Sequence, residues 1–214
     1  MFNIFGFYKF KKLGNLKKLK NRLENNLKEY EICGTIIISS EGVNGTISAK
    51  KDNLLKFNKL LKKILSIKKF NSENNSNSKF NPFHKPKVKI KKEVVPMGFK
   101  VRNYNYPSNN LNPRQWNKII KKKDTILIDA RKSFEYDVGT FKKSLNPNIE
   151  NFRQFPKYLN QFKNSENIAM FCTGGIRCEK ANIYLKKKGF KNVYVLKGGI
   201  INYLNNIDKK NSQW

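Results

Sequence analysis

The sequence predicts an α/β protein of two domains: a ferredoxin-like α+β domain at 1–95 and an α/β domain with a parallel sheet at 112–214. A linker is expected at 96–111, because that stretch lacks periodicity and carries Pro, Gly and Asn. In the first part, strand and helix patterns follow the order β-α-β-β-α-β, which is the split βαβ pattern. In the second part, continuous apolar runs alternate with helical patterns, as in sheets whose strands are buried on both faces.

The first domain contains two helical patterns and four strand patterns. Leucines recur at helical spacing in the helices, and β-branched or aromatic residues dominate the strands. The turn SEGVNG at 40–45 separates the second strand from the third. The polar stretch 71–78 is assigned to no helix or strand, whereas the last strand alternates Val88 and Ile90 with lysines. In order, the expected segments are a strand at 2–9, a helix at 14–29, strands at 30–39 and 45–49, a helix at 51–66 and a strand at 85–95.

Three apolar runs predict three parallel strands in the second domain. A helix with Pro113 in its first turn precedes them, and a helix ending near Gly189 separates the last two. Functional groups in such sheets gather beyond the carboxyl ends of the strands. The residues expected at those ends are Asp129, Arg131, Cys172 and Gly198. The expected segments are a helix at 113–122, strands at 124–131, 167–172 and 192–199, and a helix at 177–190.

The composition is strongly basic, with 45 Lys and Arg against 15 Asp and Glu and a net charge of +30. Such a charge attracts polyanions, and nucleic acid is the obvious one. The chain is also crowded with residues that A/T-rich codons encode, so drift in genome composition is an alternative source of the charge. Both explanations stay open on composition alone.

The cellular setting follows from what the sequence lacks. No apolar run is long enough to cross a membrane, and no secretion signal begins the chain. Three cysteines do not make a disulfide framework. We therefore expect a cytoplasmic protein in a reducing environment, without membrane association, and predict no protein partner.

The stretch IAMFCTGGIRCEKA at 168–181 carries the strongest chemical signal. Cys172 closes a buried strand, and a helix begins near Arg177. Gly174 and Gly175 let backbone N–H groups turn inward, and such a nest at a helix N-terminus favours an anion. Since Arg177 adds positive charge, the pKa of Cys172 should be lowered and its thiolate should be nucleophilic. The loop after Cys172 consists of Thr173, Gly174, Gly175, Ile176 and Arg177.

The other cysteines and the single histidine are weaker candidates. Cys178 lies in the first turn of the helix, where it could resolve an oxidised Cys172 as a disulfide or relay a persulfide. The alternative is a small side chain packed toward the core. Cys33 lies in an apolar strand and is expected in the core. Two thiols are too few for a metal site and His84 is far away in sequence, so no metal site is expected and no cofactor is evident.

Three segments of the second domain resemble the successive signatures of a rhodanese domain: DTILIDARKSFEYDVGTF, FCTGGIRCEKA and GFKNVYVLKGGI. The resemblance implies a catalytic Cys172 that can carry a persulfide. The spacing Cys-x4-Arg favours sulfur chemistry over that of phosphatases of the same fold, which use Cys-x5-Arg. The supporting residues implied by the resemblance are Asp129, Arg131 and Glu135, with Gly198 and Gly199 in the last loop.

Further motifs narrow the resemblance. SSEGVNGTISA, FHKPKVKIKKEVVPMG and FRQFPKY, together with CTGGIRCEKA, look like those of the rhodanese-like tRNA uridine hydroxylases, known as TrhO. That resemblance implies hydroxylation of carbon 5 of the wobble uridine of tRNA, with Cys172 catalytic and molecular oxygen as co-substrate. The partner implied is the anticodon region of tRNA. Many members continue with a segment rich in cysteine and charge, so we expect this chain to be a reduced or truncated version.

Several alternatives remain at this point. A Cys172 thiolate could attack carbon 6 of the uracil, or the cysteine could carry an oxygen or sulfur species. A plain sulfurtransferase that passes sulfur through a Cys172 persulfide is the second functional hypothesis, and an RNA-binding protein with a decayed site is the third, although the intact CTGGIR argues against decay. The lysines at 84–92 are either a solvated edge or, with the aromatic residues of 99–106, a track for RNA.

Overall fold

The computed structural model describes residues 1–104 and 108–214. It divides into two compact units, Met1–Val94 and Val95–Trp214, which are described separately below. The predicted linker at 96–111 stays a prediction, and part of the aromatic stretch 99–106 lies outside the described residues. None of the helices in the described ranges is long and apolar enough to span a membrane.

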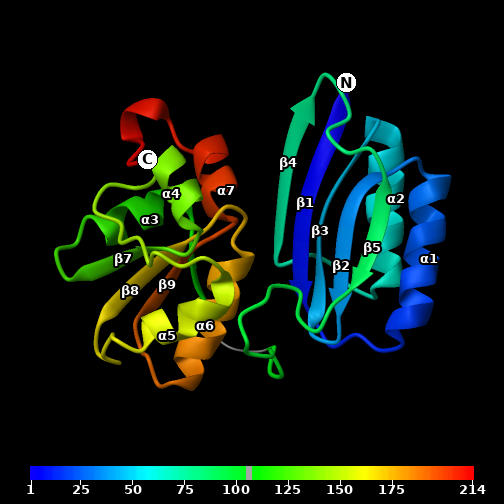
Figure 1. Cartoon of the computed structure of the whole chain (residues 1–214). Coiled ribbons are helices and arrows are strands. Elements are labelled where there is room, and N and C mark those ends of the chain that lie inside the picture. Colours follow the sequence, from blue (N-terminus) through cyan, green and yellow to red (C-terminus); the bar gives the residue numbers. More distant parts are fainter. Residues whose placement is uncertain (105–107) are drawn as a thin grey trace. The chain divides into compact units, whose positions relative to one another are not determined.

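The first unit is a five-stranded mixed sheet in the order β4-β1-β3-β2-β5, with both of its helices on one face (Figure 1). Neighbouring strands are antiparallel except β2 and β5, which are parallel. The four strands β1 to β4 and the two helices follow the order β-α-β-β-α-β, so the predicted fold class is confirmed. The elements are β1 (Phe2–Phe10), α1 (Leu16–Glu29), β2 (Cys33–Ser39), β3 (Gly42–Ala49), α2 (Lys51–Ile64), β4 (Ser72–Ser78) and β5 (Pro86–Ile90).

The strand that completes the split βαβ pattern is not the one expected from the sequence. The polar stretch 71–78, for which no strand was expected, forms β4, which pairs antiparallel with β1 from Phe2↔Ser78 to Tyr8↔Ser72. Because β4 is an edge strand and most of its residues are at least partly exposed, it needs no hydrophobic pattern. The stretch expected to be the last strand forms β5 only at Pro86–Ile90, a fifth strand added at the opposite edge.

The SEGVNG motif is explained mostly by packing inside the first unit. Its turn is confined to Ser40 and Glu41, and Gly42 already begins β3. Glu41 is fully buried and its carboxylate accepts a hydrogen bond of 2.9 Å from the N–H of Val94. A Cβ on Gly45 would stand 2.7 Å from the ring of Phe7, so only glycine fits there without a shift. The motif therefore fixes strand packing and the end of the unit.

The second unit is a four-stranded parallel sheet in the order β6-β9-β8-β7, which confirms the predicted α/β class. The three predicted strands are present, and the short strand β6 is an addition that the sequence did not reveal. The elements with a role below are β6 (Asn109–Leu111), α3 (Pro113–Ile120), β7 (Thr125–Asp129), α4 (Ser133–Val138), α5 (Phe155–Leu159), β8 (Asn167–Phe171), α6 (Ile176–Lys187), β9 (Val193–Leu196) and α7 (Gly199–Asn206).

Strand β8 lies at the centre of the core of the second unit. Ile168, Ala169, Met170 and Phe171 are all fully buried, so both faces of β8 are covered, as the continuous apolar run predicts. On one face, Phe171 joins an aromatic cluster, and its ring meets that of Phe141 edge-on at 4.8 Å. The strand therefore delivers the residue that follows it, Cys172, from a rigid position.

Candidate active site

Cys172 directly follows β8 and is 1% exposed. The backbone N–H of Gly175 donates to its sulfur at 3.2 Å. Gly175 has a left-handed backbone, with φ of 97°, and stands immediately before the first residue of α6. The predicted inward turn of the loop is thus present, with one glycine supplying both the turn and an N–H group.

The surroundings of Cys172 favour its thiolate. Burial raises the pKa of the thiol, but several groups outweigh burial: the thiol of Cys178, the charge of Arg177, and the N–H groups of Cys178 and Gly175. The result is a pKa lowered from 9.0 to about 6. At neutral pH the sulfur is therefore mostly ionised, which is the nucleophilic state.

Cys178, the third residue of α6, is fully buried and its thiol is hydrogen-bonded to Cys172. Burial and the hydrogen bond to Cys172 raise its pKa well above 9.0. The two thiols are therefore unequal, because Cys172 carries the negative charge and Cys178 keeps its proton as donor. Cys33, expected in the core, lies at the start of β2 and is only partly buried.

Arg177 is held by Glu135 in a two-point ion pair. Its Nη1 and Nη2 donate to the carboxylate oxygens of Glu135 at 2.9 and 3.0 Å. Thr173 joins the same group, because its hydroxyl donates to Glu135 at 2.9 Å and accepts from Arg177 at 3.1 Å. Burial raises the pKa of Glu135, yet these bonds and the N–H of Lys132 lower it to about 2. The network ties both ends of the Cys172 loop to α4.

Asp129 and Arg131 form a second, more deeply buried pair, 1% and 7% exposed. The guanidinium of Arg131 donates to both carboxylate oxygens of Asp129, at 2.8 and 2.6 Å for the shorter bonds. It also donates to the carbonyl of Gly139 at 2.6 Å, and the hydroxyl of Thr140 donates to Asp129 at 3.0 Å. The pair thus fixes the chain around α4, at the end of β7, and the charge of Asp129 also helps to raise the pKa of Cys178.

The last loop lies directly against the Cys172 loop. The N–H groups of Ile200 and Ile201, in the first turn of α7, donate to the carbonyls of Cys172 and Thr173 at 3.0 and 3.2 Å. A Cβ on Gly199 would stand 2.3 Å from the carbonyl oxygen of Cys172. This close approach is the physical reason for glycine at 199, the second of the pair that the sequence pointed to at 198–199.

Two contributors were missed by the sequence reasoning. Thr140 supports Asp129 from a segment without a regular pattern, and only the fold brings it there. Trp214 places its ring under Arg131, 5.2 Å from the guanidinium carbon. Thr140 falls inside the signature DTILIDARKSFEYDVGTF but was not singled out from it, and no local signal in the sequence links Trp214 to the site. Across residues 1–104 and 108–214, no group of three or more His, Cys, Asp and Glu side chains is placed to hold a metal ion.

Comparison with known proteins places the sequence of this chain in a family. The chain is 63% identical to the tRNA uridine(34) hydroxylase of Pelagibacter ubique over 214 residues, which are the whole of this chain and 71% of that protein. It is 41% identical to the tRNA uridine(34) hydroxylase of Legionella pneumophila strain Corby, over 99% of this chain and 84% of that one. The chain belongs to the tRNA uridine(34) hydroxylase family.

Family models match both units of this tRNA uridine(34) hydroxylase family member. Residues 2–94 match the UPF0176 acylphosphatase-like domain, and residues 112–206 match the rhodanese-like domain. Among solved structures, a rhodanese-related protein from Thermoplasma volcanium aligns with 45% of this chain and 91% of its own, at 22% identity and a TM-score of 0.39. The resemblance stated from the motifs is thus confirmed at the level of the family.

Proposed function

We propose that this chain hydroxylates carbon 5 of the wobble uridine in tRNA, with Cys172 as the catalytic nucleophile. The observation that carries the proposal is the buried Cys172 sulfur with a pKa of about 6, in a chain 63% identical to a curated tRNA uridine(34) hydroxylase. The dependence on molecular oxygen is part of the proposal and rests on resemblance to the family.

The proposed chemistry begins with attack of the Cys172 thiolate on carbon 6 of the uracil ring. The addition forms a carbon–sulfur bond and moves the electron pair of the C5–C6 double bond toward carbon 5 and the carbonyl oxygen O4. Carbon 5 then becomes the electron-rich position that takes one atom of molecular oxygen. Loss of the carbon 5 proton and expulsion of the Cys172 thiolate from carbon 6 restore the C5–C6 double bond. The second oxygen atom leaves as water, with two electrons and two protons from a cellular reductant, which the proposal takes to be a thiol. A target base in an anticodon loop is unpaired and can be splayed out of its stack, which would let it reach the loop.

The other site residues would act on the loop and not on the base. The pair of Arg177 with Glu135 holds the guanidinium near Cys172, so its charge continues to favour the thiolate. Thr173 ties the loop to Glu135, and Gly199 lets the start of α7 approach the loop closely. Asp129 and Arg131 would have a positioning role, because each is already committed to the other.

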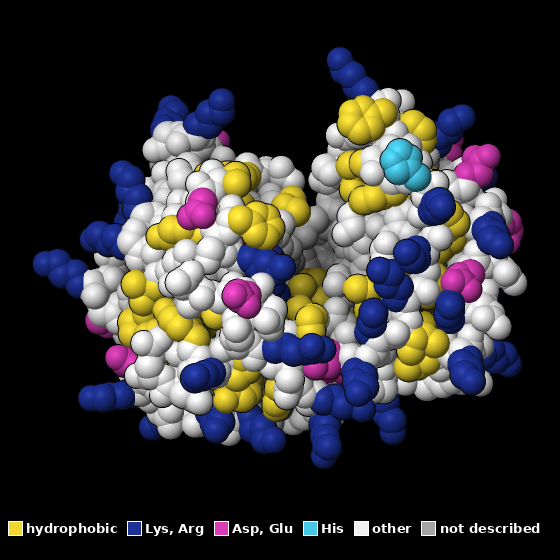
Figure 2. All heavy atoms as spheres, in the orientation of Figure 1, with side chains coloured by type: hydrophobic (Ala, Val, Ile, Leu, Met, Phe, Trp, Pro, Cys, Tyr) yellow, Lys and Arg dark blue, Asp and Glu magenta, His cyan; other side chains and the backbone are white. Residues whose placement is uncertain are grey.

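The first unit would contribute to tRNA binding through its lysine-rich edge strand. Lys87 and Lys89 lie on β5, which pairs with β2 alone at the edge of the sheet. Lys85 and Lys87 are exposed. Lysine and arginine side chains are spread over the visible face of both units, whereas acidic ones are few (Figure 2). Such a surface suits the phosphates of RNA.

The test is nucleoside mass spectrometry of tRNA from cells that lack this protein. We expect the hydroxylated wobble uridine to disappear and to return with the wild-type gene. Cys172→Ser should fail to restore it, whereas Cys33→Ser, which removes a thiol of the first unit, should restore it fully. A fully active Cys172→Ser variant would show that the site assignment is wrong.

The competing activity is sulfur transfer through a Cys172 persulfide, which the Cys-x4-Arg loop would also support. Cells that lack the protein would then keep the hydroxylated uridine, and the purified protein would transfer sulfur from thiosulfate to cyanide. That combination would replace the hydroxylase proposal, while growth without oxygen should lower hydroxylation if the proposal is right.

A further inference from the structure

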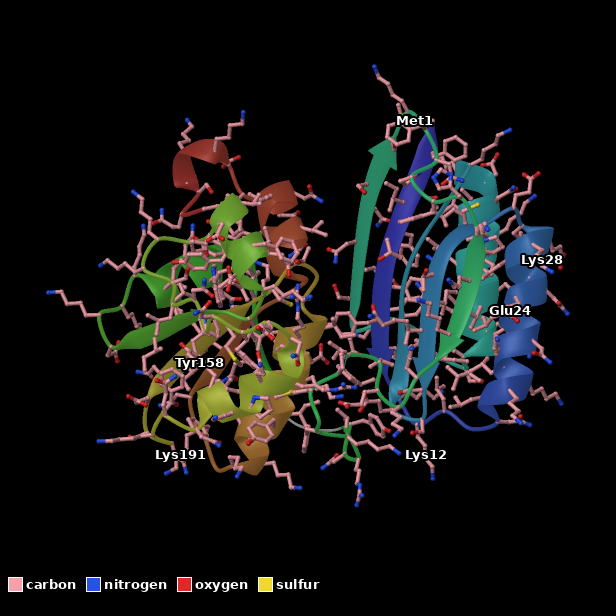
Figure 3. All side chains as sticks on the ribbon, in the orientation of Figure 1. Met1, Lys12, Glu24, Lys28, Tyr158 and Lys191 are labelled. Carbon is pink, nitrogen blue, oxygen red and sulfur yellow. The ribbon has the colours of Figure 1, made fainter. Side chains whose placement is uncertain are left out.

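The second unit contains a cavity of about 410 Å³ that the active-site loop does not use. Three of its lining residues come from the FRQFPKY motif at 152–158, which no part of the proposed chemistry explains. The cavity lies between α5 and the segment before it, and Tyr158 on α5 is labelled in Figure 3. The lining residues are Asn148, Ile149, Gln154, Lys157, Tyr158 and Gln161.

The aromatic residues of the motif form a continuous stack that ends at this cavity. The rings of Phe152 and Phe155 are 5.0 Å apart and inclined by 24°, and those of Phe155 and Tyr158 are 6.0 Å apart and inclined by 21°. Phe152 and Phe155 are buried, whereas Tyr158 is only half-buried. Since Tyr158 is held by packing, a flat ring placed on it would not need to order the side chain first.

The polar lining offers groups that match a nucleotide. The carbonyl oxygen of the Asn148 side chain accepts from the hydroxyl of Ser133 at 3.2 Å, which leaves its amide nitrogen to donate. The amide nitrogen of Gln161 donates to the carbonyl of Tyr158 at 3.0 Å, which leaves its side-chain oxygen to accept. Lys157 is exposed and cationic. A donor, an acceptor, a cation and an aromatic ring thus surround one cavity that is lined by no carboxylate.

Contacts already described connect this cavity to the Cys172 loop. Asn148 bonds to Ser133, the first residue of α4. Two residues later in α4, Glu135 holds both Arg177 and Thr173 of the loop. Phe134, between them, is 64% exposed, so a further apolar surface lies on the same turn. The cavity therefore flanks the helix that positions the catalytic loop.

We propose that this cavity binds a second, unpaired nucleotide of the RNA substrate, next to the nucleotide that enters the Cys172 loop. Its base would stack on Tyr158, the amides of Asn148 and Gln161 would contact the base edge, and Lys157 would contact a phosphate. Aromatic stacking with polar contacts to base edges is how proteins usually recognise single-stranded RNA loops. The inference rests on the proposed function, and it names the part of the chain that would select the anticodon loop.

The experiment measures binding of the full chain to a fluorescein-labelled anticodon stem-loop RNA, and separately hydroxylation of the intact tRNA. Tyr158→Leu should weaken binding about tenfold, because loss of one stacked base contact has about that effect. Tyr158→Phe keeps the ring and should bind like the wild type. Lys157→Ala should weaken binding and lower the dependence on salt by about one unit of slope.

Tyr184→Leu is the matched control. Tyr184 is also half-buried and meets a phenylalanine ring edge-on at 5.5 Å, as Tyr158 meets Phe162, but it does not line the cavity. It should bind RNA like the wild type. Equal weakening by Tyr158→Leu and Tyr184→Leu, or none by Tyr158→Leu, would overturn the proposed nucleotide site.

Photo-crosslinking of the wild-type chain to a stem-loop that carries 5-iodouridine gives a second readout that does not depend on folding of a variant. We expect the RNA adduct on the peptide that contains Tyr158, and adducts confined to other peptides would contradict the site. Binding that depends on Tyr158 without any hydroxylation would leave the nucleotide site standing and reject the hydroxylase function. Hydroxylation that Tyr158→Leu leaves unchanged would support the hydroxylase function and reject the nucleotide site.

Discussion

At the scale of single residues, the proposed chemistry depends on how a fully buried sulfur is kept ionised. Burial alone would hold Cys172 in its neutral form. The Cys178 thiol, the N–H of Gly175 and the charge of Arg177 reverse that preference. Cys178 is therefore a hydrogen-bond donor to Cys172, which is a more specific role than either the disulfide partner or the packed side chain considered from the sequence.

The role of Cys178 can be measured through the ionisation of Cys172. Absorbance of the thiolate in the ultraviolet should rise through a midpoint near pH 6 in the wild type and vanish in Cys172→Ser. In Cys178→Ala we expect the midpoint to rise by about one unit, because a hydrogen bond to a charged group contributes roughly 1.5 kcal/mol and 1.36 kcal/mol equals one pKa unit.

Cys178→Ser keeps a donor and should restore most of the lowering, and Cys33→Ser should leave the curve unchanged. An unchanged midpoint in Cys178→Ala would show that Arg177 and the backbone N–H groups are sufficient. Activity limited by the thiolate should follow the same curve, falling as pH drops below the midpoint.

At the scale of elements, the start of helix α7 packs against the Cys172 loop, which precedes helix α6. The first turn of α7 donates two N–H groups to the loop carbonyls, and Gly199 allows the approach. The same scale shows where local patterns mislead, because β4 consists of Ser, Asn and Glu and still forms a full edge strand. The composition of β4 does not predict a strand, and β4 forms because its backbone pairs with that of β1.

The contact of α7 with the loop predicts a large effect for Gly199→Ala. Its φ is 66°, and the added methyl group would overlap the carbonyl of Cys172, so we expect the variant to lose at least about 2 kcal/mol of unfolding free energy and most of its activity. Gly189→Ala is the control, with φ of 88° but only a flexible side-chain end nearby. It should cost about 1 kcal/mol.

Urea unfolding of both variants separates strain from steric overlap, because the two positions share the backbone conformation and differ in their neighbours. Equal losses at positions 199 and 189 would mean that the backbone conformation alone matters. The close approach of α7 to the loop would then have no energetic consequence.

At the scale of the whole molecule, the net charge of +30 is the dominant feature. Basic side chains cover both units on the face shown in Figure 2, in agreement with binding to RNA phosphates and equally with a compositional bias. The two explanations differ in one measurable quantity, which is the release of counterions on binding.

The salt dependence of tRNA binding distinguishes them. If six or more phosphates are contacted, affinity should fall by about a thousandfold or more between 50 and 200 mM salt. If the edge strand β5 and its flanking residues bind the RNA, replacing the exposed lysines Lys85 and Lys87 by alanine should reduce the slope of log affinity against log salt concentration. Replacing Lys28 and Lys56 on the helices should leave that slope unchanged. A flat response in the wild type would make the charge a matter of composition.

The sequence by itself determined the fold class of both units, the Cys172 loop and the family. These are local signals. Alternation and helical spacing indicate which side chains are buried, and Cys-x4-Arg after an apolar run predicts a nucleophile at the end of a strand. Strand β4 and the short strand β6 were not predicted, because an edge strand can form by pairing with its neighbour without a hydrophobic pattern of its own.

Only the tertiary structure decided what the site residues do for one another. Glu135 and Arg177 are 42 positions apart, and no local rule pairs them. The structure showed that Asp129 and Arg131 are committed to each other, that Cys178 donates to Cys172, and that SEGVNG packs within its own sheet. Hydrogen bonds and close packing between distant segments exist only once the chain is folded, which is why the sequence could name these residues but not their roles.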